Sequence, residues 1–184
     1  MRRAILFIDG QYLTHIERHY EMRIPYSELA CEIARTRGVH VEQTYYYTAP
    51  PFQGTPPAVD EKQRKAGYDR FLRALTKQGI AVREGRCQKI GGTYAQKGVD
   101  TLLTIDLIRM RQNHPDAQTA LVLTGDTDFV PAIRAAQDDR IDVVLIYAED
   151  RSRHSKIRLA NALLAICPNR VRITPELIER VRNR

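Results

Sequence analysis

The chain has 184 residues, 43% of them hydrophobic, and a formal net charge of +7 at pH 7, which suits one domain with a sizeable buried core. No run approaches the roughly 18 consecutive apolar residues that a membrane span requires, and the N-terminal run of residues 1–8 is too short for a secretory signal. We therefore expect a single cytoplasmic domain over residues 1–184, without a membrane span.

The cysteines and the positive charge exclude some classes and favour others. Cys31, Cys87 and Cys167 form no Cys-x-x-Cys pair, which indicates reduced thiols and excludes a zinc finger or a disulfide framework. Most of the basic residues are arginines, whose guanidinium groups bind phosphate through paired hydrogen bonds. A polyanionic partner is therefore favoured, although an ordinary basic surface accounts for the charge equally well.

Apolar runs alternate with helical patterns along the chain, which predicts strand–helix–strand units around a parallel sheet and hence an α/β fold. Residues 4–8 form a continuous apolar run, as expected for a central strand buried on both faces. Helical spacing over residues 26–37 ends at Gly38, a common residue after a helix. Residues 39–47 are rich in β-branched and aromatic side chains and predict the next strand.

The middle and end of the chain continue this alternation. Prolines in residues 48–57 predict a loop, and the glycine pair at 91 and 92 predicts a hairpin or mobile excursion over residues 86–94. The other predicted helices cover residues 59–78, 99–110, 129–137, 155–166 and 174–182, and the other strands cover 80–84, 121–124 and 141–147. We expect residues 141–147 to close the sheet and the terminal helices, within 153–184, to pack on the domain.

Four aspartates are expected to meet at one edge of the sheet. Asp9 ends the first strand and Asp126 follows a later one, and parallel sheets bind ligands at the carboxyl ends of their strands. Asp100 and Asp128 lie in first helical turns, where each taken alone is an ordinary capping residue. Carboxylates gathered in a crevice repel each other unless cations lie between them, and oxygen ligands suit Mg²⁺ or Mn²⁺. The sequence therefore predicts a metal site able to support phosphodiester hydrolysis.

Three segments carry a resemblance to a known family: FIDG at residues 7–10, KGVD at 97–100 and TGDTDF at 124–129. The order and spacing of these three segments are those of a family. The chain resembles the NYN domains of the PIN-like nuclease superfamily over nearly its whole length, particularly their bacterial LabA-like branch. The resemblance implies a Rossmann-like three-layer fold with a mainly parallel central sheet flanked by helices. It also implies RNA cleavage with Mg²⁺ or Mn²⁺ held by Asp9, Asp100, Asp126 and Asp128.

Further residues take supporting roles in this prediction. Lys97 is close enough in sequence to Asp100 to steady a phosphate, and Thr124 and Thr127 belong to the TGDTDF motif. Asp106 points about 120° away from Asp100 around the helix, where a solvated or hydrogen-bonded carboxylate explains it as well as a role at the site.

One position departs from the family pattern, which often reads Asp-Gly-x-Asn on the first strand. Tyr12 stands in place of that Asn. The departure keeps a second function open, in which the chain is a catalytically weak or inactive RNA-binding regulatory module of the same fold. Against it, four aspartates would repel phosphate in a pure binder of polyanions.

Two basic clusters are expected to contact RNA, most simply as a single strand. They contain Arg86, Lys89, Arg151, Arg153 and Lys156, and phosphate contacts of this kind supply most sequence-independent affinity. A solvated surface explains each cluster equally well. Tyr45, Tyr46 and Tyr47 are expected to pack on their strand rather than stack on bases, and the loop with Phe52 is expected near the site. A homo-oligomer is compatible with the sequence, which carries no sign that decides it.

Other chemistries fit less well. A haloacid-dehalogenase-like phosphatase needs Asp-x-Asp on the first strand, and Gln11 occupies the second position. Toprim-type enzymes need a Glu on an earlier strand, which is missing beside Asp9. His15 and His19 share helical spacing but have no third imidazole or His-Glu-x-x-His context, which argues against zinc, and His154 and Ser155 lack a recognisable triad order.

Overall fold

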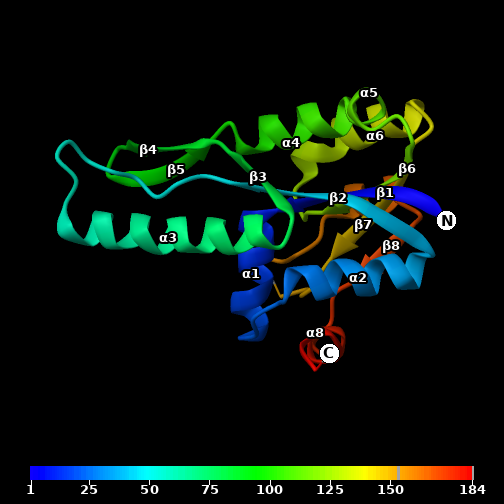
Figure 1. Ribbon diagram of the computed structural model, residues 1–184, viewed down its shortest axis with the longest axis horizontal. Coiled ribbons are helices and arrows are strands. Elements are labelled where there is room, and N and C mark those ends of the chain that lie inside the picture. Colours follow the sequence, from blue (N-terminus) through cyan, green and yellow to red (C-terminus); the bar gives the residue numbers. More distant parts are fainter. Residues whose placement is uncertain (153, 184) are drawn as a thin grey trace.

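Strands and helices alternate along the chain in the computed structural model, which describes residues 1–152 and 154–183 (Figure 1). The strands are β1 (Arg2–Asp9), β2 (Val39–Thr48), β3 (Ile80–Glu84), β4 (Arg86–Ile90), β5 (Thr93–Lys97), β6 (Ala117–Leu123), β7 (Asp142–Tyr147) and β8 (Arg170–Arg172). The helices are α1 (Gly10–Tyr20), α2 (Tyr26–Arg37), α3 (Val59–Lys77), α4 (Val99–Ile108), α5 (Met110–Asn113), the 3-10 helix η1 (Thr127–Phe129), α6 (Val130–Asp138), α7 (Asn161–Ile166) and α8 (Pro175–Arg182).

The central sheet has the strand order β3-β2-β1-β6-β7-β8, and every neighbouring pair in it is parallel. Because β1 lies in the middle, its neighbours β2 and β6 end at the same edge as it does. Strands β4 and β5 form a separate antiparallel hairpin. The predicted α/β fold with a mainly parallel sheet is confirmed.

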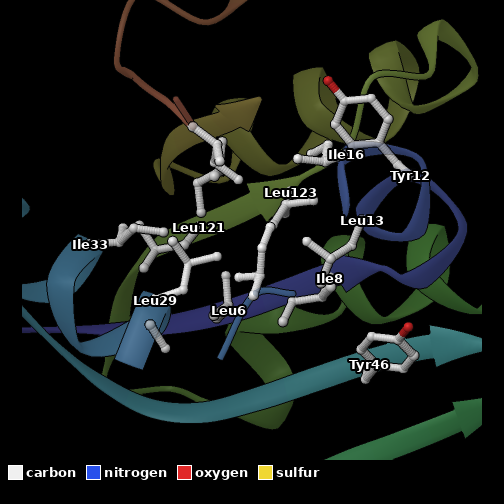
Figure 2. Packing of buried hydrophobic residues seen from close by; sticks show 14 of the residues in the cluster. Leu6, Ile8, Tyr12, Leu13, Ile16, Leu29, Ile33, Tyr46, Leu121 and Leu123 are labelled. Carbon is white, nitrogen blue, oxygen red and sulfur yellow. The ribbon is translucent and has the colours of Figure 1, made fainter. Parts of the chain in front are cut away.

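Helices cover both faces of this sheet. Successive residues of a strand point to opposite sides, so β1 contributes apolar side chains to a separate cluster on each face. Leu6 and Ile8 of β1 pack with apolar residues of α1 and α2 in one cluster (Figure 2). Ile5 and Phe7 of the same strand pack with residues of α4 and α6 in a second cluster. The result is the three-layer arrangement that the resemblance implies. In the described part of the chain, no helix is both long and apolar enough to cross a membrane.

Most predicted elements are confirmed with shifts at their ends, but the predicted helix over residues 155–166 is wrong in its first half. Helix α7 starts later, after a stretch in which the buried Ile157 and Leu159 flank the exposed Arg158. This alternation buries both apolar side chains with a period of two, so no helix is needed there.

Among the described residues, the sequence prediction lacks helix α1, strand β8 and the short helices α5 and η1. Helix α1 follows β1 directly, and β8 pairs with β7, so the prediction that residues 141–147 close the sheet is wrong. Strand β8 has three residues, of which both arginines are exposed. It therefore lacks the apolar run that would reveal a strand.

An extension of the fold, here called the arm, comprises residues 49–58, α3 and the β4–β5 hairpin. Figure 1 shows α3 and the hairpin extending together away from the central sheet. The ring of Phe52 lies 5.5 Å from that of Tyr94 on β5, and the side chain of Gln53 donates to the carbonyl of Glu61 on α3 at 2.8 Å. These contacts join residues 49–58, the connecting segment between β2 and α3, to both the hairpin and the helix.

Candidate functional site

Asp9 and Thr124 form the centre of the site, where β1 and β6 end side by side. The Asp9 carboxylate caps α1 by accepting from the backbone N–H groups of Gln11 at 3.0 Å and Tyr12 at 3.1 Å. Its other oxygen accepts from the buried Thr124 hydroxyl at 3.2 Å. The same hydroxyl accepts from the backbone N–H of Asp126 at 3.2 Å. Thr124 therefore ties the two strand ends, and their aspartates, together.

Asp126 and Asp128 lie on the turn that follows β6. The Asp126 side chain caps η1 by accepting from the backbone N–H of Asp128 at 2.9 Å. Asp126, Thr127 and Asp128 are all exposed. Their side chains are therefore available to a ligand from solvent, unlike that of Thr124.

Asp100 reaches the site from the first turn of α4. Gly98 precedes this helix with a φ of +80°, a conformation that glycine adopts without strain. Gly85, at the base of the hairpin, packs directly against the start of α4, because a Cβ there would lie 2.5 Å from the Lys97 carbonyl oxygen and 2.8 Å from the Val99 side chain. The hairpin base and the Asp100 segment thus form one packed unit.

A pocket of about 350 Å³ brings these residues together. Asp9, Asp100, Asp126 and Thr127 line it. Gln11, Tyr12, His15, Gly125, Lys156 and Ala160 complete its walls. Carboxylates from three separate elements therefore face one concave space.

Burial and neighbouring negative charge raise the pKa of two of these carboxylates, Asp9 and Asp100. Burial, with a further contribution from the charge of Asp100, raises the pKa of Asp9 to about 6, against its hydrogen bonds, which lower it. Burial and the charges of Asp126 and Asp128 raise the pKa of Asp100, which places Asp128 within electrostatic reach of the pocket. Among residues 1–152 and 154–183, no three His, Cys, Asp or Glu side chains form a compact group that could hold a metal ion. The carboxylates line the pocket without converging on one point, an arrangement that their repulsion favours.

Asp106 is placed in a different environment. It is buried on α4, where Arg83 of β3 donates to both of its oxygens at 2.8 and 2.7 Å. The hydroxyl of Tyr47 donates to the same carboxylate at 2.9 Å. Asp106 is not among the residues that line the pocket, so the structure shows it as part of an internal ion pair.

The predicted basic residues are spread over several surfaces. Lys156 lines the pocket, whereas Lys97 is exposed at the end of β5. Arg86 is exposed on β4, and the Lys89 ammonium lies 5.8 Å from the centre of the Tyr94 ring. The remaining two are Arg151, which pairs with Glu149 at 3.1 Å, and Arg153, which lies outside the described residues.

Helix α1 contributes residues that the sequence analysis did not assign to the site. Gln11 and His15 are four residues apart and therefore share one face of the helix, and both line the pocket. Burial, together with the charges of Lys156 and Arg18, lowers the pKa of His15, which favours the neutral form of its imidazole. The sequence does contain a signal for Gln11 and His15. Asp9-Gly10 is a pattern that can begin a helix, and the four-residue spacing then places both side chains on one face of it.

Tyr12 lines the pocket and is buried. Its hydroxyl donates to the Ala148 carbonyl at 2.9 Å and accepts from the Ala148 N–H at 3.2 Å. A Cβ on Gly125 would clash with the Tyr12 ring. Tyr12 is therefore a structural connection between α1 and the end of β7. As predicted, Tyr46 and Tyr47 are packed in the core.

Comparisons with known proteins agree with this architecture. A crystal structure of a protein of unknown function from Vibrio parahaemolyticus is similar with a TM-score of 0.66 and 19% sequence identity, over 95% of this chain and 94% of that one. At this identity the likeness concerns the fold. No curated protein matches the sequence significantly. The sequence profile of the NYN domain matches residues 3–166, nearly the whole of the chain. The chain thus belongs to the NYN domain family, a branch of the PIN-like nuclease superfamily.

Proposed function

We propose that the chain is a metal-dependent ribonuclease that hydrolyses RNA phosphodiester bonds, with Mg²⁺ or Mn²⁺ held by Asp9, Asp100, Asp126 and Asp128. The observation that carries this proposal is the pocket itself, which carboxylates from the ends of β1 and β6 and from the start of α4 line together. Family membership adds that the chain comes from a nuclease superfamily.

The donor set fits a hard divalent ion. Three carboxylates line the pocket, and oxygen ligation suits Mg²⁺ and Mn²⁺. Asp9 is held in one orientation by its three hydrogen bonds, and one oxygen of Asp126 is held by the Asp128 N–H. The side chains of Asp100, Asp126 and Asp128 are exposed and therefore accessible to an ion from solvent. A divalent cation bound there would supply the charge neutralisation and water activation that phosphodiester hydrolysis needs.

Three further residues at or beside the pocket have distinct tasks in this proposal. Thr124 fixes Asp9 relative to Asp126 through its two hydrogen bonds. Lys156, which lines the pocket, attracts a substrate phosphate that the aspartates alone would repel. The neutral imidazole of His15 adds a hydrogen-bonding group that adds no further charge to the site.

A second candidate function is an RNA-binding regulatory module of the same fold that cleaves slowly or not at all. Tyr12 favours it, because the family often has Asn at this position. The Tyr12 hydroxyl is bound to the backbone of Ala148 and so does not offer the amide oxygen that Asn would bring to the pocket.

The two functions are separated by hydrolysis of labelled single-stranded RNA and DNA in Mn²⁺, Mg²⁺ or EDTA. Wild type is compared with Asp126→Asn, which removes a charge but keeps the volume and an oxygen to accept from the Asp128 N–H. Asp116→Asn, at an aspartate that pairs with Arg3 at the other end of β1, is the matched control.

We expect cleavage that requires a metal, is lost in Asp126→Asn and is retained in Asp116→Asn. Cleavage that survives unchanged in Asp126→Asn would overturn the assignment of the site. RNA binding without cleavage in every condition would overturn the nuclease and favour the regulatory module.

A further inference from the structure

A second, larger cleft adjoins the carboxylate pocket and runs along the arm. It encloses about 730 Å³ between α1, α3 and the β4–β5 hairpin. Gln11, His15 and Asp100 line both the cleft and the pocket. The two depressions are therefore continuous, and a chain-like ligand can occupy both at once.

Arginines dominate the charge of the cleft. Arg18 and Arg23 line it near α1, Arg64 lines it from α3, and all three are exposed. The Glu17 carboxylate in this wall is buried and lies 3.6 Å from Arg23, while Asp100 lies at the end that opens into the pocket. Arg64 also pairs with the exposed Asp60 at 3.0 Å. The cleft lining therefore carries three arginines against two carboxylates and turns acidic where the proposed metal ions would bind.

The hairpin adds an exposed aromatic ring to this basic cleft. Tyr94 on β5 lines the cleft and has 54% of its surface exposed. Phe52 supports the ring from the connecting segment, with the ring centres 5.5 Å apart, and the Lys89 ammonium lies 5.8 Å from the ring centre. A supported, exposed ring beside cationic groups is the arrangement on which unpaired bases stack.

From these observations we propose that the cleft binds the nucleotides on one side of the cleaved phosphate, as a single strand. Arg18 and Arg64 contact its phosphates, and Tyr94 stacks on one of its bases. The inference rests on the proposed action on RNA and names the part of the chain that selects the form of the substrate. A duplex is excluded from the Tyr94 contact, because its bases are paired and stacked on each other.

Binding is measured by fluorescence anisotropy with a labelled 12-nucleotide single-stranded RNA and with the blunt duplex of the same sequence. EDTA is present, so the readout is independent of cleavage. Tyr94→Ala is expected to weaken single-strand binding roughly 5- to 100-fold, the loss that one base–aromatic stack represents. Tyr94→Phe keeps the ring and should bind like wild type. Duplex binding should be weaker and insensitive to Tyr94→Ala.

Arg64 and Arg73 form a matched pair on α3. They are nine residues apart and therefore point to opposite sides of the helix, and Arg73 is exposed but does not line the cleft. Log Kobs falls with log salt concentration, and losing one phosphate contact reduces the steepness of that fall by about 0.7 for a single strand. We expect this change in Arg64→Ala and not in Arg73→Ala, whereas Tyr94→Ala should lower affinity without changing the slope.

The outcomes separate this inference from the proposed function. If wild type cleaves RNA with Mn²⁺ while Tyr94→Ala and Arg64→Ala bind as wild type does, the cleft proposal is overturned and the nuclease stands. If both variants bind weakly although wild type binds without cleaving, the cleft is supported and the nuclease is overturned. If wild type neither binds nor cleaves RNA, both proposals fail.

Discussion

Asp9 and Asp106 both carry a carboxylate toward the interior, and they differ in what surrounds it. Asp106 has a cationic partner within the chain, because Arg83 donates to both of its oxygens. Asp9 has only uncharged donors, namely two backbone N–H groups and the Thr124 hydroxyl, and a like charge nearby on Asp100. The charge of Asp106 is therefore balanced within the chain. The charge of Asp9 is not, and a cation from solution would balance it.

The largest expected effect concerns cleavage. Asp9→Asn should reduce metal-dependent hydrolysis of RNA on the order of 10²- to 10³-fold, the usual cost of removing one preorganised charge-stabilising group. Asp106→Asn should keep most of the activity of each folded molecule, because its carboxylate faces Arg83 and not the pocket. Initial rates with Mn²⁺, normalised to folded protein, test this contrast. Equal losses of cleavage activity in Asp9→Asn and Asp106→Asn would contradict the different roles given to the two aspartates.

A smaller effect is expected on stability. Asp106→Ala leaves Arg83 and the Tyr47 hydroxyl without their shared acceptor, and breaking a fully buried pair costs about 3–5 kcal/mol. Because the Arg83 side chain is 44% exposed, solvent reduces the loss to about 1–3 kcal/mol. Urea unfolding measures it, with the exposed Asp116→Ala as control. A change within error would show that the ion pair contributes nothing.

A stability effect of similar size is expected as a pH dependence in the metal-free protein. Folding raises the pKa of Asp9 from 3.8 to about 6, so the folded state binds more protons between these values and its stability falls as the pH rises through 6. In EDTA at pH 7.5, Asp9→Asn should therefore be more stable than wild type, by on the order of 1–3 kcal/mol. Below pH 4 this advantage should disappear.

Adding a divalent metal should reduce or reverse the difference in stability between wild type and Asp9→Asn. Mn²⁺ at about 100 times its Kd would stabilise wild type by about 2.7 kcal/mol and should stabilise Asp9→Asn much less. Free energies of unfolding at several pH values, with and without Mn²⁺, give both quantities. A wild type that gains nothing from Mn²⁺ would contradict metal binding at Asp9.

The sequence was sufficient for the parts that follow from local patterns. The apolar run before Asp9 and the strand before Asp126 predict two strands ending at one edge, and β1 and β6 are indeed neighbours. The pairing of Asp106 with Arg83 was not predictable, because it joins a helix to a strand 23 residues away and no local spacing encodes it. The role of Tyr12 also depends on a distant partner, the backbone of Ala148.

Other errors have a different origin. Residues 154–160 bury their apolar side chains with a period of two inside a segment that also fits a helical pattern, and the irregular backbone there depends on tertiary packing. Strand β8 is defined by its pairing with β7 rather than by apolar residues of its own. Its position therefore depends on the neighbouring strand and not on a local sequence pattern.

The close packing at Gly85 makes the hairpin modular. Its base is wedged against Lys97 and Val99, next to Asp100, while its tip at Gly91 and Gly92 is exposed and crowded by nothing within 4 Å of either Cβ position. Insertions or deletions at the tip would change how far the arm reaches along a nucleic acid and leave the carboxylates where they are. Evolution or engineering can therefore alter the footprint of this domain separately from its chemistry.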